Sequence, residues 1–279
     1  MDTFKDIKLL VFDLDGTLYQ DEYFVETYLT YLFKEDAAKW IQEAHRILND
    51  QHAVKVGHFF NKEMKAGVCH RSGEVTGHYD WDGKDIKLAE DISAQNGMHY
   101  IGDAWGVIGA IADYMGIPDN DRSNAFNSVR RDMILGNNAI KSHGGLAAAI
   151  RGLTSIPYKI LMSNSPEEAA VDFVPKLGLD NLFDTIIFGG NKPAGLTSFL
   201  KSFMDEKGIK PEQVLSIGDN AWNDLYPVKY MGGRTIWISP YESKDEQVWD
   251  MRLRTLDELE NLLITLNNRK STKLSHNGV

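Results

Sequence analysis

Short apolar runs alternate with amphipathic segments along the second half of the chain. The apolar runs have the length of buried strands, and between them apolar residues recur at the spacing of a helix face. The predicted strands cover residues 157–162, 184–188, 213–217 and 235–238, and the predicted helices cover residues 166–177, 196–207, 222–231 and 255–267. A further apolar run, Ile7–Phe12, adds an N-terminal strand. Because strands that alternate with helices are typical of a parallel sheet flanked by helices, the pattern predicts an α/β fold.

The periodicity between the first strand and residue 143 is mainly helical. Four helices are predicted, at residues 22–34, 37–48, 98–115 and 121–135. A polar stretch with several glycines, Gly67–Asp85, is interpreted as a loop or a short hairpin. We therefore expect a core domain of residues 1–20 and 143–267 and a mainly helical domain of residues 21–142 inserted into it. The polar residues 268–279 are expected to form a disordered tail.

The first strand ends in two aspartates, Asp13 and Asp15, followed by Gly16 and Thr17. Side chains two residues apart on an extended segment point the same way, and the carboxyl ends of strands are where open α/β sheets bind ligands. One carboxylate can attack a phosphorus atom while the other protonates the leaving oxygen. Acidic residues can also simply end a strand, but Asp-x-Asp-Gly-Thr after a buried strand is a more specific pattern, and it favours phosphoryl chemistry.

Polar residues also follow the later predicted strands. Ser163 follows the second strand, Lys192 and Pro193 follow the third, and Asp219 and Asp224 follow the fourth. Each alone has an ordinary explanation, as a strand-end cap, a surface charge or an acidic residue at a helix start. Their common position at strand ends is what indicates a site.

Together with the segment Asp13–Tyr19, these residues resemble the four sequence motifs of the haloacid dehalogenase (HAD)-like hydrolase superfamily, and they occur in the same order. The resemblance implies a Rossmann-like parallel-sheet core, with a mainly helical cap domain inserted between the first two motifs. It also implies that Asp13 attacks phosphorus to form an aspartyl-phosphate. Asp15 would then serve first as general acid and afterwards as general base.

The resemblance also assigns the groups that bind phosphate. A phosphoryl group in transfer carries charge on three oxygens, so positioning and charge neutralisation dominate its catalysis. The Ser163 hydroxyl and the Lys192 ammonium are expected to supply that neutralisation, and Asn164 is expected to contact the phosphate beside Ser163. Tyr19, directly after the first motif, is a further candidate for a substrate contact.

A cation is expected among the acidic residues, because several carboxylates in one site would otherwise repel one another. Mg²⁺ prefers oxygen ligands and bridges readily to phosphate. By resemblance its protein ligands are the carboxylates of Asp13 and Asp219 and the backbone carbonyl of Asp15. The residues expected to surround the metal and the phosphate without binding them directly are Thr17, Asn223 and Asp224.

Asp15 also narrows the predicted reaction. In the superfamily that the chain resembles, an Asp two residues after the nucleophile goes with phosphatases and phosphomutases, and other residues there go with dehalogenases. The prediction is therefore a magnesium-dependent phosphatase that hydrolyses a small-molecule phosphomonoester. A phosphomutase on the same core is an alternative, and so is a catalytically weak binding or regulatory module.

Composition and charge favour a soluble enzyme. The chain has 279 residues, with 30 basic and 40 acidic residues and a formal net charge of -10, and its only cysteine is Cys69. It shows no basic patch of the kind that nucleic-acid binding needs, no apolar stretch of membrane-spanning length and no apolar signal region. We therefore expect a cytoplasmic protein, a monomer or homodimer, whose partner is a phosphorylated metabolite and neither nucleic acid nor a membrane.

Residues that select the substrate are expected in the insert. Cationic and aromatic side chains that could bind a second phosphate or a base are His70, Arg71, His78, Trp81, Arg122, Arg130 and Arg131. Each alone is more readily explained by packing or solvation. In particular, His70 and His78 are interpreted as surface histidines, Trp81 as the anchor of a loop, and Arg130 and Arg131 as one packed and one solvated residue.

Overall fold

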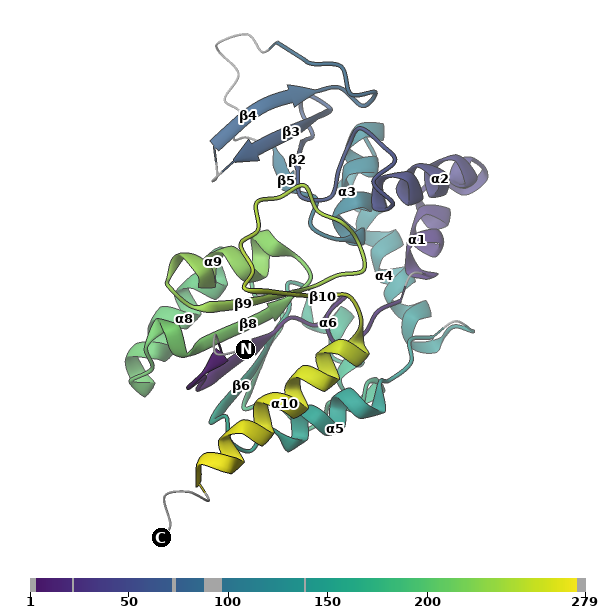
Figure 1. Ribbon diagram of the computed structural model, residues 1–279. Coiled ribbons are helices and arrows are strands. Elements are labelled where there is room, and N and C mark those ends of the chain that lie inside the picture. The colour runs from purple at the N-terminus through teal and green to yellow at the C-terminus, as the bar shows by residue number, and fades with distance from the viewer. Residues whose placement is uncertain (1–3, 22, 72–73, 88–96, 138, 275–279) are drawn as a thin grey trace. The chain divides into compact units, whose positions relative to one another are not determined.

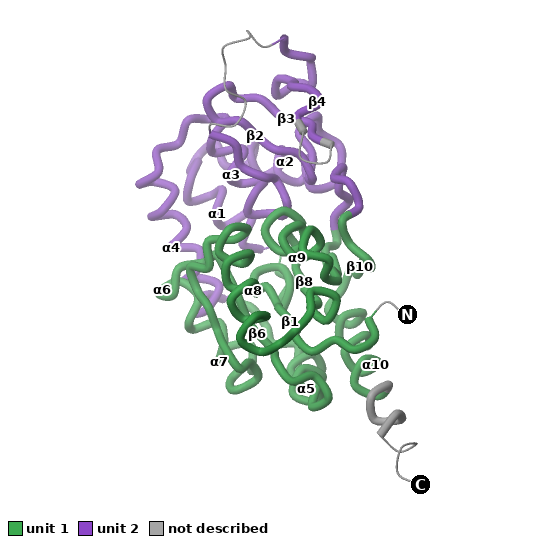
Figure 2. The backbone as a smooth tube through the Cα atoms, turned by 90° about the vertical axis from the view of Figure 1, so that its left-hand side faces the viewer, with its two compact units in different colours: residues 1–21, 139–240, 248–279 green, residues 22–138, 241–247 purple. Residues whose placement is uncertain are grey.

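The chain divides into two compact units in a computed structural model that describes residues 4–21, 23–71, 74–87, 97–137 and 139–274. Unit 1 contains residues 1–21, 139–240 and 248–279, and unit 2 contains residues 22–138 and 241–247 (Figure 2). The segment 241–247 thus belongs to unit 2, whereas the sequence analysis placed it in the core domain. None of the helices in the described ranges combines the length and the apolar composition that crossing a membrane requires.

Unit 1 is built on a six-stranded sheet in which every pairing is parallel (Figure 1). Its strands are β1 (Leu9–Phe12), β6 (Tyr158–Met162), β7 (Thr185–Ile187), β8 (Val214–Gly218), β9 (Arg234–Ile238) and β10 (Met251–Leu253). The spatial order is β10-β9-β8-β1-β6-β7, so β1 lies between β6 and β8. All four residues of β1 are buried, which is why it reads as a continuous apolar run.

Helices cover both faces of this sheet. They are α5 (Gly144–Gly152), α6 (Glu167–Ala170), α7 (Phe173–Lys176), α8 (Ala194–Lys207), α9 (Tyr226–Tyr230) and α10 (Leu256–Leu274). Side chains of α8 and α9, among them Leu200 and Val228, pack on Leu9 and Val11 of β1. Figure 1 shows α5 and α10 side by side on the opposite face. The predicted Rossmann-like α/β core is therefore confirmed.

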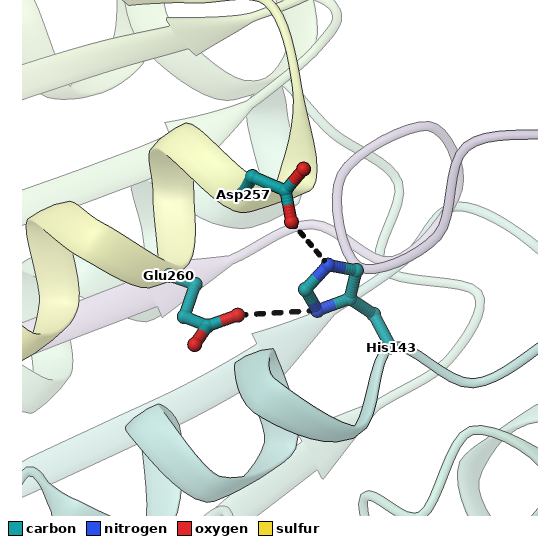
Figure 3. A group of neighbouring side chains, drawn as sticks. All are labelled: His143, Asp257 and Glu260. Carbon is teal, nitrogen blue, oxygen red and sulfur yellow. Dashed lines mark hydrogen bonds and ion pairs between the residues drawn. The ribbon is translucent and has the colours of Figure 1, made fainter.

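His143 joins the starts of α5 and α10. Its Nδ1 accepts a hydrogen bond from the Leu146 N–H (3.1 Å), which caps α5, and its Nε2 contacts Asp257 Oδ1 at 2.9 Å. Glu260 Oε2 lies 3.6 Å from the Nδ1 atom (Figure 3). Close packing supports this contact, because a side chain on Gly145 would overlap the Glu260 carboxylate.

Unit 2 combines helices with a four-stranded antiparallel sheet of order β4-β3-β2-β5. Its helices are α1 (Tyr23–Phe33), α2 (Ala37–Leu48), α3 (Ala104–Met115) and α4 (Asp119–Leu135), and its strands are β2 (Phe59–Asn61), β3 (Ala66–Arg71), β4 (Glu74–Tyr79) and β5 (Met98–Tyr100). The inserted domain is thus less purely helical than the sequence predicted. Except for its first residue, Ala66, the hairpin β3–β4 falls within the stretch that was interpreted as a loop or short hairpin.

Several element boundaries differ from the predictions for identifiable reasons. The helix predicted at 98–115 begins only at Ala104, because residues 98–100 pair with β2 and Asp103 caps the helix by accepting the Gly106 N–H at 2.7 Å. The predicted helix at 222–231 starts with a π-helical turn, Ala221–Leu225. Helix α10 extends to Leu274, so the start of the predicted disordered tail is helical, and residues 275–279 lie outside the described residues.

Candidate active site

The parallel sheet of unit 1 brings the predicted motifs to one edge. Asp13 follows β1, Ser163 follows β6 and Asp219 follows β8, and these three strands are neighbours. Because parallel strands end at the same edge of a sheet, motifs far apart in the chain meet there. Lys192, which follows β7, reaches the same place, since its ammonium contacts Asp13, 179 residues earlier in the chain.

Lys192 lies between two carboxylates. Its Nζ is 2.6 Å from Asp13 Oδ1 and 2.6 Å from Asp224 Oδ1, and all three side chains are buried. The other carboxylate oxygen of Asp13 accepts a hydrogen bond from the Thr17 hydroxyl at 3.3 Å. The second oxygen of Asp224 accepts the Asn220 N–H at 3.1 Å. The predicted nucleophile is thus held in one orientation beside a fixed positive charge.

Burial and neighbouring charges shift the pKa values of Asp13, Asp224 and Lys192. It raises the pKa of Asp13 to about 7, an effect that the Lys192 ammonium opposes and that Asp224 and Asp15 reinforce. Burial also raises the pKa of Asp224 above its ordinary value, again against Lys192. Burial by itself would lower the pKa of Lys192, but the two carboxylates outweigh burial and raise this pKa. Two carboxylates therefore share one buried ammonium, and full ionisation of both calls for a further cation.

The carboxylates suit a divalent cation. Asp13, Asp219 and Asp224 each offer an oxygen atom, and these atoms lie within 4.8 Å of one another. Two glycines make room for them: a Cβ on Gly16 would lie 2.0 Å from Asp219 Oδ2, and a Cβ on Gly218 would lie 2.3 Å from Asp224 Oδ2. An all-oxygen donor set with surplus negative charge is what Mg²⁺ prefers. The set includes Asp224, which the sequence analysis placed outside the direct ligands.

Asp15 points toward hydroxyl groups. Its Oδ1 accepts a hydrogen bond from the Tyr19 hydroxyl at 2.5 Å, and its Oδ2 accepts bonds from Ser163 Oγ at 3.1 Å and Ser165 Oγ at 2.9 Å. Sequence reasoning did not select Ser165. The available signal was its spacing, since it lies two residues after Ser163 and its N–H donates to the Ser163 hydroxyl at 3.1 Å.

Asn164 contacts the backbone of Lys192, a role that the sequence did not predict. Its Oδ1 accepts the Lys192 N–H at 2.6 Å and its Nδ2 donates to the Lys192 carbonyl at 3.2 Å. Both polar ends of the side chain are therefore occupied by one backbone segment, next to the cis bond between Lys192 and Pro193. Asn164 orients the lysine loop through these two bonds, and its predicted contact with phosphate stays a prediction.

The family assignment follows from these four motifs and their surroundings. The family model described as haloacid dehalogenase-like hydrolase matches residues 7–232, which is most of the chain and contains every residue of the site. This chain is a HAD-like hydrolase. No curated protein matches its sequence.

Solved structures show the same fold for this HAD-like hydrolase. The candidate HAD-hydrolase YfnB from Bacillus subtilis, solved with bound magnesium, has a TM-score of 0.55 at 15% identity, over 93% of this chain and 99% of that one. A candidate phosphatase from Clostridium difficile has a TM-score of 0.52 at 14% identity, with coverage of 93% and 99%. The L-2-haloacid dehalogenase RSc1362 has a TM-score of 0.50 at 15% identity, with the same coverage.

The remaining predicted site residues of this hydrolase lie nearby or in unit 2. Asn223 lies in the π-helical turn beside Asp224, where its N–H donates to Asn220 Oδ1 at 3.1 Å. Trp237, which sequence reasoning did not select, donates from its indole to the Asp219 carbonyl at 2.7 Å and so supports the turn after β8. No motif spacing points to this tryptophan.

Two of the candidates in unit 2, Trp81 and Arg130, pack in its interior. Trp81 is buried and stacks on Tyr114, with ring centroids 4.3 Å apart. Arg130 is buried and Arg131 is exposed, which confirms one packed and one solvated arginine. The prediction of surface histidines is wrong for His70, since its side chain is only 2% exposed and lies beside the Asp245 carboxylate within the same unit. His78 is half-buried.

Proposed function

We propose that this HAD-like hydrolase is a magnesium-dependent phosphatase that acts on a small phosphomonoester. The observation that carries the proposal is the pair of carboxylates at positions 13 and 15, one paired with Lys192 and the other held by hydroxyl groups. An alkoxide leaving group needs a proton, which a second carboxyl can supply, whereas a halide leaves readily without one. The arrangement therefore has a use in phosphoester hydrolysis that it lacks in dehalogenation.

The fold by itself does not choose between these reactions. The similar structures include both a haloacid dehalogenase and a candidate phosphatase, all at about 15% identity or below. The choice therefore rests on this chain's own side chains.

In the proposed reaction, a carboxylate oxygen of Asp13 attacks phosphorus and the bond to the ester oxygen breaks. Asp15 gives its proton to that oxygen, so the alcohol leaves neutral and an aspartyl-phosphate forms. Asp15, now ionised, takes a proton from water while the water oxygen attacks phosphorus. Phosphate leaves and the Asp13 carboxylate is restored. Lys192 keeps the nucleophile oriented and neutralises charge on the transferring group.

Asp13, Asp219 and the Asp15 backbone carbonyl would hold Mg²⁺ in this proposal, with Asp224 within reach as a further ligand. When bound, the metal neutralises the surplus negative charge and favours the ionised form of Asp13, which is the form that attacks. This need agrees with the raised pKa values of the two buried carboxylates that share Lys192.

We propose further that the substrate is a soluble phosphorylated metabolite, and that the protein acts in the cytoplasm as a monomer or homodimer. The net charge of -10 disfavours binding to polyanions such as nucleic acid or to anionic membranes. Local groups, chiefly Lys192, would attract the phosphate.

The test measures release of inorganic phosphate from a panel of phosphomonoesters, with Mg²⁺ and with a chelator, for the wild type and Asp13→Asn. Chloride release from 2-chloropropionate is measured in parallel. We expect phosphate release that needs the metal and falls by roughly 10⁴-fold or more without the nucleophile. Chloride release without phosphate release would contradict the proposal. Transfer of phosphate within a sugar phosphate, without release, would favour the phosphomutase.

A further inference from the structure

Three hydroxyl groups from two separate segments converge on the Asp15 carboxyl. Tyr19 belongs to the segment that leaves β1, and its backbone forms a β-bridge with Asp15 itself. Ser163 and Ser165 belong to the segment that leaves β6, about 150 residues away in sequence (148 and 150 residues, respectively). Both oxygens of the carboxyl group are contacted, so its rotation about the Cβ–Cγ bond is restrained from two sides.

Hydroxyl groups suit the task assigned to Asp15 in the proposed mechanism. A general acid that later acts as a base is protonated in one half of the cycle and ionised in the other. An N–H group or an ammonium can only donate, so it would favour the ionised form alone. A hydroxyl can donate or accept after rotation of its O–H bond. The same three oxygens can therefore hold Asp15 in place in both states.

The three hydroxyls differ in what else they are expected to bind. Ser163 is the predicted phosphate ligand, and its oxygen also accepts the Ser165 N–H. When Ser163 turns toward a phosphoryl oxygen, the other two hydroxyls are left to hold Asp15. Tyr19 is the more rigid of the two, because it is only 2% exposed and its ring packs on Phe173 with centroids 5.6 Å apart.

We propose that Tyr19 is a positioning residue for proton transfer, which it supports by fixing the orientation of Asp15, and that Ser165 assists it. The inference rests on the proposed phosphatase function and goes beyond it, since it separates a residue that orients the acid from residues that bind phosphate. It also gives Tyr19 a different role from the substrate contact expected from sequence.

The test compares two esters that differ in their need for an acid. Tyr19→Phe removes only the hydroxyl and keeps the buried ring. Tyr158→Phe removes a tyrosine hydroxyl from β6 of the same sheet and is the matched control. Each variant is assayed with an alkyl phosphate, whose alkoxide needs a proton, and with 2,4-dinitrophenyl phosphate, whose leaving group does not.

For Tyr19→Phe we expect kcat/KM on the alkyl phosphate to fall roughly tenfold to a hundredfold, a part of the general-acid contribution. On the dinitrophenyl ester kcat/KM, which covers the chemistry only as far as the aspartyl-phosphate, should change less than about threefold, because that step requires no proton. The kcat for this ester should fall, because attack by water on the aspartyl-phosphate uses Asp15 as base. Ser165→Ala should show the same pattern with a smaller loss, and Tyr158→Phe should resemble the wild type with both esters.

A double-mutant cycle adds a readout that a purely structural role would not give. If Tyr19 acts through Asp15, adding Tyr19→Phe to Asp15→Asn should cost little further kcat. Equal losses of kcat/KM on both esters, additive effects in the cycle, or no loss at all would overturn the positioning role while leaving the phosphatase intact. A wild-type protein that hydrolyses neither ester would instead overturn the proposed function and the positioning role together.

Discussion

Two groups of side chains in unit 1 share one arrangement, in which a basic residue lies between two carboxylates. In the candidate active site Lys192 lies between Asp13 and Asp224, and all three side chains are at most 8% exposed. At the starts of α5 and α10, His143 lies between Asp257 and Glu260 (Figure 3). The side chains of this group, called the exposed group below, are 26%, 81% and 27% exposed in that order. The two groups differ chiefly in their contact with water.

That difference decides what each group can do. Water screens the charges around His143, so such contacts contribute little to stability. Around Lys192 the charges cannot be hydrated, so each carboxylate depends on the ammonium, and the pKa of Asp13 rises to about 7. A buried arrangement of this kind is poised to respond to a cation or a phosphoryl group, whereas the exposed one serves as a helix contact.

The largest expected effect comes from Lys192→Ala, because it leaves two buried carboxylates without their ammonium. Breaking a buried ion pair typically destabilises a protein by about 3–5 kcal/mol. Urea unfolding should show a loss of this size, and phosphate release should fall sharply in kcat and rise in KM. If stability and kinetics were unchanged, burial would not be what distinguishes the group around Lys192 from the group around His143.

Metal binding provides a second test of the difference between the two groups. Mg²⁺ at a hundred times its dissociation constant should stabilise the wild type by about 3 kcal/mol, because it binds only the folded carboxylate site. Thermal unfolding with increasing Mg²⁺ measures this shift. Asp219→Asn, which removes one oxygen donor from the site, should show a much smaller rise in Tm, and His143→Ala should respond like the wild type. An equal response in all three proteins would place the metal elsewhere.

A half-buried histidine in unit 2, His58, provides a third case, because it is neutral in the folded protein. Burial lowers the pKa of His58 to about 4 from an ordinary 6.5, and His70, Lys55 and Lys244 reinforce the shift. The neutral ring is within hydrogen-bond distance of the Tyr79 hydroxyl, 2.6 Å from Nδ1. Between pH 6.5 and pH 4 the unfolded chain therefore binds a proton that the folded chain does not.

The stability contributed by neutral His58 should be fully present above pH 6.5 and should be lost as the pH falls toward 4, by up to about 3 kcal/mol. Urea unfolding across this range measures the slope. His58→Gln should unfold with a shallower dependence on pH. A slope that the substitution leaves unchanged would assign the acid sensitivity to other groups, of which His52 and His78 also have lowered pKa values.

The smallest effect is expected for the exposed group. His143→Ala removes a helix cap and two screened contacts, so it should cost about 1 kcal/mol of stability and leave phosphate release unchanged. Asp257→Asn should cost less still. A loss as large as that of Lys192→Ala would show that burial is not the deciding difference between the two groups.

The sequence predicted the parts of the site that depend on local pattern. Asp13 and Asp15 could be recognised because an apolar strand and a glycine turn flank them, and Gly16, with a φ of 76°, supplies that turn. Lys192 and Asp219 could be placed because they follow predicted strands. Ser165 and the role of Asn164 could not, because each depends on a contact with a segment far away in the chain.

In the inserted domain, too, the elements with a local pattern were predicted and those that depend on distant contacts were not. Helices α1 and α2 have strong local periodicity and begin and end within a residue of the predicted ranges. Strand β5, in contrast, is three residues long and depends on its pairing with β2, so its residues were assigned to the following helix. The segment 241–247 is grouped with unit 2 through contacts such as the Lys244 N–H to the Val56 carbonyl at 2.8 Å, which no local pattern reveals.

The sequence by itself determined the α/β class, the order of the motifs and the residues proposed to attack, protonate and neutralise, because these follow from periodicity, turn chemistry and side-chain type over short spans. Only the tertiary structure decided that Lys192 bridges two buried carboxylates, that Asn164 orients the lysine loop, and that three hydroxyls hold Asp15. The physical reason is that these properties depend on burial and on contacts between strand ends up to 179 residues apart, which only the folded sheet brings together.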